Sequence, residues 1–341
     1  DRYAIIKIEI KMERKDRLME IPVKKIGEFV KGERVEGFFL LKSVTLKTTN
    51  SGGKKYLDLV LSDKTGDILG KVWEIKPEHE ELKSNTVFKI RGTVNSWQGT
   101  LQLKVEHASK VTEEDNINLD DFVQSAPYTS DEMFNTIKDT VHNMNDVDIK
   151  NILNRVLEIN KDKLMYYPAA KSNHHSIKGG LLYHITTMLK LAENICGIYD
   201  FLNRDLVYAG VILHDMAKIK EMSSNEMGIV DEYTLEGTLL GHITQGIKEI
   251  EVIGKEVNAD SKIIMLLQHM VLSHHYEPEY GSPVKPLIPE AEMLHYLDVM
   301  DARMYDMKKA IKETKENEFS ERIWSLDSRR IYNHGMYEKN N

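Results

Sequence analysis

Two adjacent residues, His214 and Asp215, are the part of this chain best suited to chemistry, and Lys218 follows the histidine by four positions. An imidazole nitrogen and a carboxylate oxygen are both ligands for divalent metals. Residues four apart on a helix face the same way, so the ammonium of Lys218 would lie beside a metal held by the pair. A cation there could hold a phosphate oxygen next to the metal. The three residues predict metal-dependent hydrolysis of a phosphate ester, with Asp215 and Lys218 in catalytic roles.

Histidines gather around this pair. Of the 13 histidines in the chain, nine fall between His174 and His295, and two carboxylates follow shortly after. Spacings this long exclude a zinc finger or another locally folded metal loop. They suit a bundle whose helices each deliver one or two ligands to a shared centre. With His214 and Asp215, the candidate ligands for two metals bridged by Asp215 are His184, His242, His274, His275, Asp298 and Asp301.

Six of the other histidines are expected to be structural or surface residues. His269 and His295 lie among apolar residues of predicted helices, so we expect them to be partly buried structural residues. The other four lie outside the cluster and are expected on the surface: His79, His107, His142 and His334.

Length and composition describe an ordinary two-domain protein of 341 residues, with 41% hydrophobic and 29% charged residues. We find no run of about 18 apolar residues and no secretory signal, so neither a membrane protein nor an exported one is expected. The single cysteine, Cys196, is expected to be buried, and its lack of an internal disulfide partner fits a reducing cytoplasm.

Charge is distributed unevenly along the chain. Residues 1–110 carry 22 Lys and Arg against 16 Asp and Glu, a balance of +6, and the rest carry 24 against 38, a balance of −14. This suits an anion-binding module joined to a cation-binding one, although on charge alone an ordinary solvated surface is the better explanation.

The front of the chain has the pattern of short strands separated by turns. Three strands, a short helix and two further strands are predicted, at residues 35–46, 56–62, 68–73, 76–83, 87–94 and 100–105. This order within about 80 residues is that of an OB-fold, a small Greek-key barrel. We place this domain at residues 20–111, after an arm at residues 1–19 from which we draw nothing.

OB-folds bind single-stranded nucleic acid by stacking bases on aromatic rings beside cations, although the fold also binds proteins and sugars. Trp97 stands in a polar loop and is expected to be exposed, whereas Trp73 could be exposed or buried. Phe38, Phe39 and Phe88 lie in apolar strands and are expected in the core. The candidate nucleic-acid-binding residues are Lys47, Lys54, Lys55, Tyr56, Trp73 and Trp97.

The rear of the chain has helical periodicity. After an acidic linker at residues 112–130, apolar residues recur at helical spacing, and an all-helical domain is predicted over residues 131–320, followed by a tail at residues 321–341. Its helices include residues 180–195, 203–218, 235–253, 260–273 and 289–314. The fold class is therefore α+β multidomain, an N-terminal OB-fold barrel followed by an all-α domain.

Several short segments resemble the motifs of the HD phosphohydrolase superfamily. They are Asn173-His-His-Ser-Ile-Lys-Gly-Gly-Leu-Leu-Tyr-His184, Leu213-His-Asp-Met-Ala-Lys218, Leu239-Leu-Gly-His242, Leu272-Ser-His-His275 and His295-Tyr-Leu-Asp298. With an OB-like domain in front, the resemblance over residues 20–315 narrows to the YhaM-type 3′→5′ exoribonucleases, which include a relative called CMP-binding factor.

This resemblance implies roles that spacing alone does not give. It implies metal ligands at His184, His214, Asp215 and Asp298, with His242 and His274 added in two-metal forms and His275 less firmly matched. It matches Lys218 to a lysine that contacts phosphate, and it favours Asp298 over Asp301. It further implies manganese, with iron or cobalt as alternatives, and release of nucleoside 5′-monophosphates from single-stranded RNA and also single-stranded DNA. We expect a homo-oligomer.

Two other functions stay open at this point. The same metal chemistry could hydrolyse a nucleotide or cyclic dinucleotide, with the OB domain used for assembly. A DNA-binding replication factor without catalysis is the third possibility, but the intact set of His214, Asp215 and Lys218 argues against it.

Overall fold

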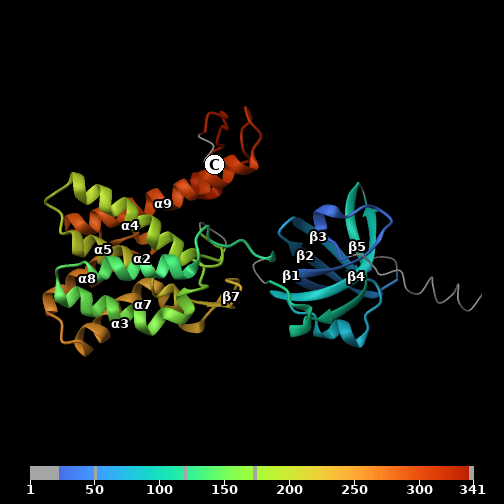
Figure 1. The fold of residues 1–341 in the computed structure, drawn as a ribbon, viewed down its shortest axis with the longest axis horizontal. Helices are drawn as coiled ribbons and strands as arrows, with labels where there is room; N and C mark the ends of the chain where they lie inside the picture. Colours follow the sequence, from blue (N-terminus) through green and yellow to red (C-terminus); the bar gives the residue numbers. More distant parts are fainter. Residues whose placement is uncertain (1–22, 50–51, 98, 119–120, 172–174, 338–341) are drawn as a thin grey trace, which may run out of the picture. The chain divides into compact units, whose positions relative to one another are not determined.

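The chain folds as two compact units, with the boundary between Gln124 and Ser125 (Figure 1). The computed structural model describes residues 23–49, 52–97, 99–118, 121–171 and 175–337. The predicted arm at residues 1–19 lies outside the described residues, and the other predicted domain limits stay predictions.

The front unit is a closed five-stranded barrel in the order β1-β2-β3-β5-β4. Its elements are β1 (Arg34–Thr48), β2 (Lys55–Asp63), β3 (Gly66–Val72), the 3₁₀ helix η2 (Pro77–Glu81), β4 (Thr86–Trp97) and β5 (Thr100–Lys110), with η1 (Ile26–Glu28) before them and η3 (Glu113–Asp115) after. The predicted order of strands and helix is confirmed. The parallel pairing of β3 with β5 closes the barrel, and the other strand pairs are antiparallel.

The barrel closes because β1 is long and bent. Its first half pairs with β4 and its second half with β2, and the register shifts between Leu41 and Ser43. Such a bulge bends a strand and lets it serve two neighbours. At Gly92 on β4 a Cβ atom would lie 2.3 Å from the carbonyl oxygen of Lys104, so the strands approach closely there only with glycine.

Two predictions in this unit are wrong. Phe38 is half-buried, not in the core, and the ammonium of Lys89 lies 5.5 Å from its ring centroid. His79 is buried, not on the surface, because its Nδ1 accepts the backbone N–H of Lys76 and closes the first turn of η2. Phe39 and Phe88 are in the core, as predicted.

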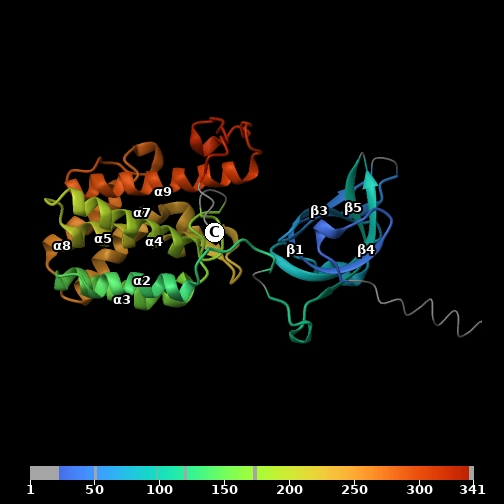
Figure 2. The ribbon, with the colours of Figure 1, turned by 45° about the horizontal axis from the view of Figure 1, so that its top comes forward.

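The rear unit is a bundle of helices with one small β-hairpin. In chain order it comprises α2 (Ser130–His142), α3 (Val147–Leu164), α4 (Gly180–Ile198), α5 (Arg204–Leu213), α6 (Lys218–Glu221), β6 (Met222–Ser224), β7 (Val230–Tyr233), α7 (Leu235–Glu256), α8 (Ser261–Ser273), η5 (Pro278–Tyr280), α9 (Pro289–Glu313) and η6 (Trp324–Leu326). The helices α4 and α5 lie in the middle, between α9 on one side and α2 and α3 on the other (Figure 2). Cys196 is buried in this core, as predicted.

The predicted helix at residues 203–218 is wrong at its C-terminal end, from residue 214 onward. The helix α5 ends at Leu213, residues 214–217 form a turn, and the four-residue α6 follows. The hairpin of β6 and β7 also departs from the all-helical prediction. Among the described residues, every helix is too short or too polar to span a bilayer.

Candidate metal centre and nucleic-acid surface

The helical unit gathers the predicted ligands from five places in the chain. His184 comes from α4, His214 and Asp215 from the turn after α5, His242 from α7, His274 and His275 from the end of α8, and Asp298 from α9. All are buried except His275 and Asp298, which are partly exposed. Since bundle helices pack side by side, residues more than a hundred positions apart can share one centre.

A first group forms around His184. Its Nε2 lies 3.3 Å from Oδ1 of Asp298 and 3.3 Å from Nε2 of His214. Oδ2 of Asp215 lies 3.5 Å from Nε2 of His214 and 3.8 Å from that of His184. The ligand atoms of His184, His214 and Asp215 all fall within 4.8 Å of one another, which suits one metal ion.

A second group lies on the other side of Asp215. One ring nitrogen from each of His242, His274 and His275 falls within 4.8 Å of the others. Oδ1 of Asp215, the oxygen that faces away from the first group, lies 3.5 Å from Nε2 of His242. The two oxygens of this carboxylate therefore face different groups.

Three atoms at this junction are buried with no hydrogen-bond partner: Oδ1 of Asp215, Nε2 of His242 and Nε2 of His274. Buried polar atoms are almost always satisfied, so each such atom calls for an ion or water. An acceptor oxygen and two imidazole nitrogens are a donor set for a divalent metal rather than for an anion. The residues present thus fit a metal ion.

Every histidine of the two groups is held at Nδ1, which directs Nε2 to the centre. Three donate Nδ1–H to a backbone carbonyl and two to a carboxylate: His214 to Val211, His274 to Val271, His275 to Tyr280, His184 to Asp301 and His242 to Glu221. A carbonyl can only accept, so in the three rings bonded to a carbonyl a proton sits on Nδ1, and the neutral ring has its lone pair on Nε2. Metal-binding histidines are oriented in this way.

Electrostatics keep the carboxylates charged. Burial opposes ionisation of Asp215, but Lys218 and His214 hold its pKa well below the usual range. Burial likewise opposes charge on Lys218, but Asp215 raises its pKa above the usual value. Burial and then His275 lower the pKa of His274, so this ring is neutral and able to bind a metal. Burial would also lower the pKa of His184, but Asp298 and Asp301 raise it to about 10.

Lys218 reaches the centre by a different route from the one predicted. In the turn after α5 the backbone N–H of Lys218 bonds to the carbonyl of Asp215, three residues back. At three residues per turn, positions i and i+3 eclipse. The ammonium therefore contacts Asp215, with Nζ 2.7 Å from Oδ2, and the predicted four-residue relation to His214 does not apply.

Two residues that sequence reasoning left without a role, His175 and Glu221, lie directly behind the ligands. Asp301, a candidate ligand that the resemblance ranked below Asp298, also lies there, bonded to Nδ1 of His184. Asp301 follows Asp298 by one helical turn, and His175 stands nine residues before His184, so spacing gave a signal for both. Nothing in the sequence marks Glu221. His269 and His295 are partly buried, as predicted for structural residues. Nε2 of His269 accepts the backbone N–H of Leu287, and Nδ1 of His295 bonds to the carbonyl of His274.

On the barrel, two predicted aromatic residues form a pair. The rings of Tyr56 and Trp73 are stacked with centroids 4.8 Å apart, and Trp73 is 43% exposed. Lys47 lies opposite Tyr56 in the β1–β2 register, and Lys47 and Lys71 both pair with Asp58.

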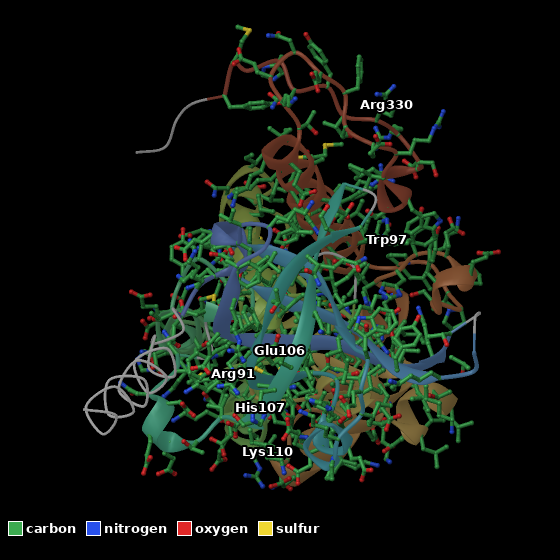
Figure 3. The ribbon with its side chains drawn as sticks, turned by 90° about the vertical axis from the view of Figure 1, so that its right-hand side faces the viewer. Arg91, Trp97, Glu106, His107, Lys110 and Arg330 are labelled. Carbon is green, nitrogen blue, oxygen red and sulfur yellow. The ribbon has the colours of Figure 1, made fainter. Side chains whose placement is uncertain are left out.

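The other predicted residues of the barrel surface are exposed. Lys54 and Lys55 lie at the β1–β2 connection. Trp97, 65% exposed, ends β4 at the opposite end of the β4–β5 hairpin from His107 and Lys110 (Figure 3).

Known proteins match both halves of the chain. A family model described as an HD domain matches residues 181–303, and one described as an OB-fold nucleic acid binding domain matches residues 41–111. The chain is 41% identical over 302 residues to the 3′-5′ exoribonuclease YhaM of Bacillus subtilis (strain 168), covering 88% of this chain and 95% of that protein. It is 40% identical, with the same coverage, to the protein of that name from Bacillus velezensis. Among solved structures, the second OB-fold domain of replication protein A from Methanococcus maripaludis matches 26% of this chain and 95% of that one, with 20% identity and a TM-score of 0.23.

Proposed function

The chain belongs to the YhaM family of 3′-5′ exoribonucleases, and from that premise we propose that it shortens single-stranded RNA at a centre of two divalent metal ions that share Asp215. The single observation that carries the proposal is the division of the Asp215 carboxylate, with Oδ2 near one ligand group and Oδ1 near the other. A carboxylate placed in this way could serve both groups if each held a divalent ion.

The proposed ligands follow from the two groups. His184, His214, Asp215 and Asp298 would hold the first ion, and Asp215, His242 and His274 would hold the second, with His275 as a further ligand. We propose manganese. Iron and cobalt also suit a centre of imidazoles bridged by a carboxylate.

Such ions supply an activated water and neutralise charge on the phosphate. The side chains of this unit divide the remaining work. Lys218 places a positive charge beside the phosphate and stabilises charge that develops on its non-bridging oxygens. The Nδ1 bonds of the histidines fix their orientation, so the centre does not have to reorganise when substrate arrives. A nucleophilic side chain is not required. The oxygen of water forms a bond to phosphorus as the bond from phosphorus to the 3′-oxygen of the preceding nucleotide breaks. That oxygen takes up a proton, so the products are a nucleoside 5′-monophosphate and a strand one nucleotide shorter with a free 3′-hydroxyl.

The barrel is proposed to hold the single strand. The stacked pair of Tyr56 and Trp73 beside Lys47, and the exposed Trp97, offer rings for bases and cations for the backbone. Stacking on a base does not require a 2′-hydroxyl, so single-stranded DNA is proposed as a second substrate. We also propose a cytoplasmic homo-oligomer, because Cys196 is free and exposed leucines such as Leu235 and Leu287 suit an interface.

End-labelled RNA tests the reaction. With manganese, a 5′-labelled strand should give a ladder of shortening fragments, and a 3′-labelled strand should give labelled mononucleotide at once. The reverse pattern, or cuts in a circular strand, would overturn the exonuclease proposal. Faster hydrolysis of a cyclic dinucleotide than of RNA would support the nucleotide hydrolase instead.

A further inference from the structure

We propose that the two metal positions are controlled by two separate carboxylates that bind no metal themselves, Asp301 acting through His184 and Glu221 acting through His242. This inference rests on the proposed two-metal centre and adds a separate positioning residue for each ion.

Asp301 holds His184 from behind. Its Oδ2 lies 2.7 Å from Nδ1 of His184, and the opposite ring nitrogen, Nε2, faces Asp298 and His214. Asp301 and His184 are both buried, so water does not compete for this bond. A carboxylate here fixes the tautomer of the ring and increases the basicity of Nε2.

A further histidine fixes Asp301. Nε2 of His175 lies 2.7 Å from the same Oδ2, so two ring N–H groups converge on one oxygen. His175 is buried, its φ of 54° lies in the left-handed region, and its ring packs against Tyr305 with centroids 4.1 Å apart. A non-glycine residue adopts such a conformation only where its surroundings enforce it. His175 thus holds Asp301 in place for His184.

Glu221 positions His242 by bonding to both its backbone and its ring. The helix α7 is broken at Gly241, whose φ of 68° and ψ of 165° are not helical, and the break frees the backbone N–H of His242. Oε1 of Glu221 accepts both this N–H, at 3.0 Å, and the ring Nδ1–H, at 3.1 Å. Backbone and ring are therefore fixed by one oxygen, with Nε2 directed at Asp215.

The two carboxylates act on different ions because their histidines belong to different groups. His184 lies with His214, whereas His242 lies with His274 and His275. In Asp301→Asn or Glu221→Gln a neutral amide oxygen replaces the charged carboxylate oxygen as the acceptor, so the ring is held less firmly and its Nε2 is a weaker metal ligand. Losing such an outer partner typically costs about 10- to 100-fold in metal affinity.

Manganese binding to the full-length chain, followed by electron paramagnetic resonance of free Mn²⁺, tests this without reference to activity. Two backgrounds isolate the positions: His274→Ala keeps the first, and His214→Ala keeps the second. Asp301→Asn should weaken binding about 10- to 100-fold in the first background and leave the second within about threefold, and Glu221→Gln should do the reverse.

Controls separate positioning from folding. Glu290→Gln changes another buried carboxylate of α9, one that accepts the N–H of Asn203, and should leave both affinities unchanged. If Asp301→Asn does not fold, as judged by circular dichroism, His175→Gln tests the same link and should weaken only the first position.

The outcomes distinguish this inference from the function on which it rests. Equal weakening of both positions by either substitution, or no weakening, overturns the inference alone, provided that the unsubstituted chain binds two Mn²⁺. An unsubstituted chain that binds no Mn²⁺ overturns the metal centre itself and this inference with it.

Discussion

The ammonium of Lys218 is paired with Asp215: Nζ lies 2.7 Å from Oδ2, and both side chains are largely buried. This oxygen also faces His184 and His214. The positive charge of Lys218 therefore compensates the negative charge of Asp215 within the group of candidate ligands. A buried cation that already contacts the proposed shared ligand would meet a phosphate bound at the proposed ions.

Lys218→Met should lower kcat by about 10²- to 10³-fold while manganese still binds, because the variant loses one group that stabilises charge in the transition state. Single-turnover hydrolysis of labelled RNA at saturating Mn²⁺ measures this. Lys220→Met is the control, since Lys220 pairs with Glu249 instead. Unchanged kcat in Lys218→Met would limit Lys218 to a structural role.

The same substitution should affect stability in a metal-dependent way. Removing one partner of a buried pair leaves the other charge uncompensated, at a cost of about 3–5 kcal/mol. The metal-free variant should therefore melt well below the metal-free parent, and Mn²⁺ should raise its Tm by more than it raises the parent's. Equal Tm shifts in the two proteins would contradict this.

Asp215→Ala should remove both ions and abolish hydrolysis, because both proposed positions use this carboxylate. The fold should persist, as judged by circular dichroism, since the apolar core of the bundle does not include Asp215. Metal analysis by mass spectrometry provides the check. Two ions retained per chain, together with activity, would make the shared-carboxylate arrangement wrong.

Metal binding should weaken as pH falls. In the metal-free chain Asp298 and Asp301, against the effect of burial, raise the pKa of His184 to about 10 from 6.5, so this ring is protonated at neutral pH. The stability that this charge gives the metal-free fold is fully present below pH 6.5 and is lost as pH rises through about 10. A metal needs the ring deprotonated, so binding should release a proton at pH 7. Titration calorimetry in buffers of different ionisation enthalpy measures that proton, and buffer-independent heats would refute the expectation.

The stacked rings on the barrel should act as one unit. Tyr56→Ala and Trp73→Ala should each cost about 1–3 kcal/mol of binding to a single strand if a base stacks there. Because the rings touch, the double variant should cost less than the sum of the two. Fluorescence anisotropy with labelled RNA in the Asp215→Ala background, which prevents cleavage, gives these values. Strict additivity would mean that the two rings contact separate bases.

The exposed lysines should determine salt dependence. Replacing a lysine that contacts phosphate reduces the slope of log K against log salt concentration by about 0.7 for single strands. Lys54→Gln and Lys55→Gln should each show this change in the same anisotropy assay, whereas Lys42→Gln, whose side chain pairs with Asp67, should not. A slope that all three substitutions leave unchanged would remove the β1–β2 connection from the binding surface.

Local periodicity was sufficient to predict the barrel and most of the bundle. The alternation of residues 56–62 predicts a strand with one buried face, and β2 buries Leu57, Leu59 and Leu61 accordingly. The grouping of histidines predicted a shared metal centre, because no locally folded loop could use ligands so far apart. These features depend on residue type and on the spacing of residues along the chain, and both can be read from the sequence alone.

The positioning of the ligands was decided by the tertiary structure. Lys218 reaches Asp215 because the chain tightens to a three-residue turn after Leu213, whereas continuous helix was predicted. Asp301 bonds to His175 across 126 positions, and no periodicity relates residues on separate elements. A hydrogen bond forms only when packing brings donor and acceptor to within about 3 Å. The pairing of carboxylates with histidines therefore depends on how α4, α6, α7 and α9 pack and on where α7 breaks.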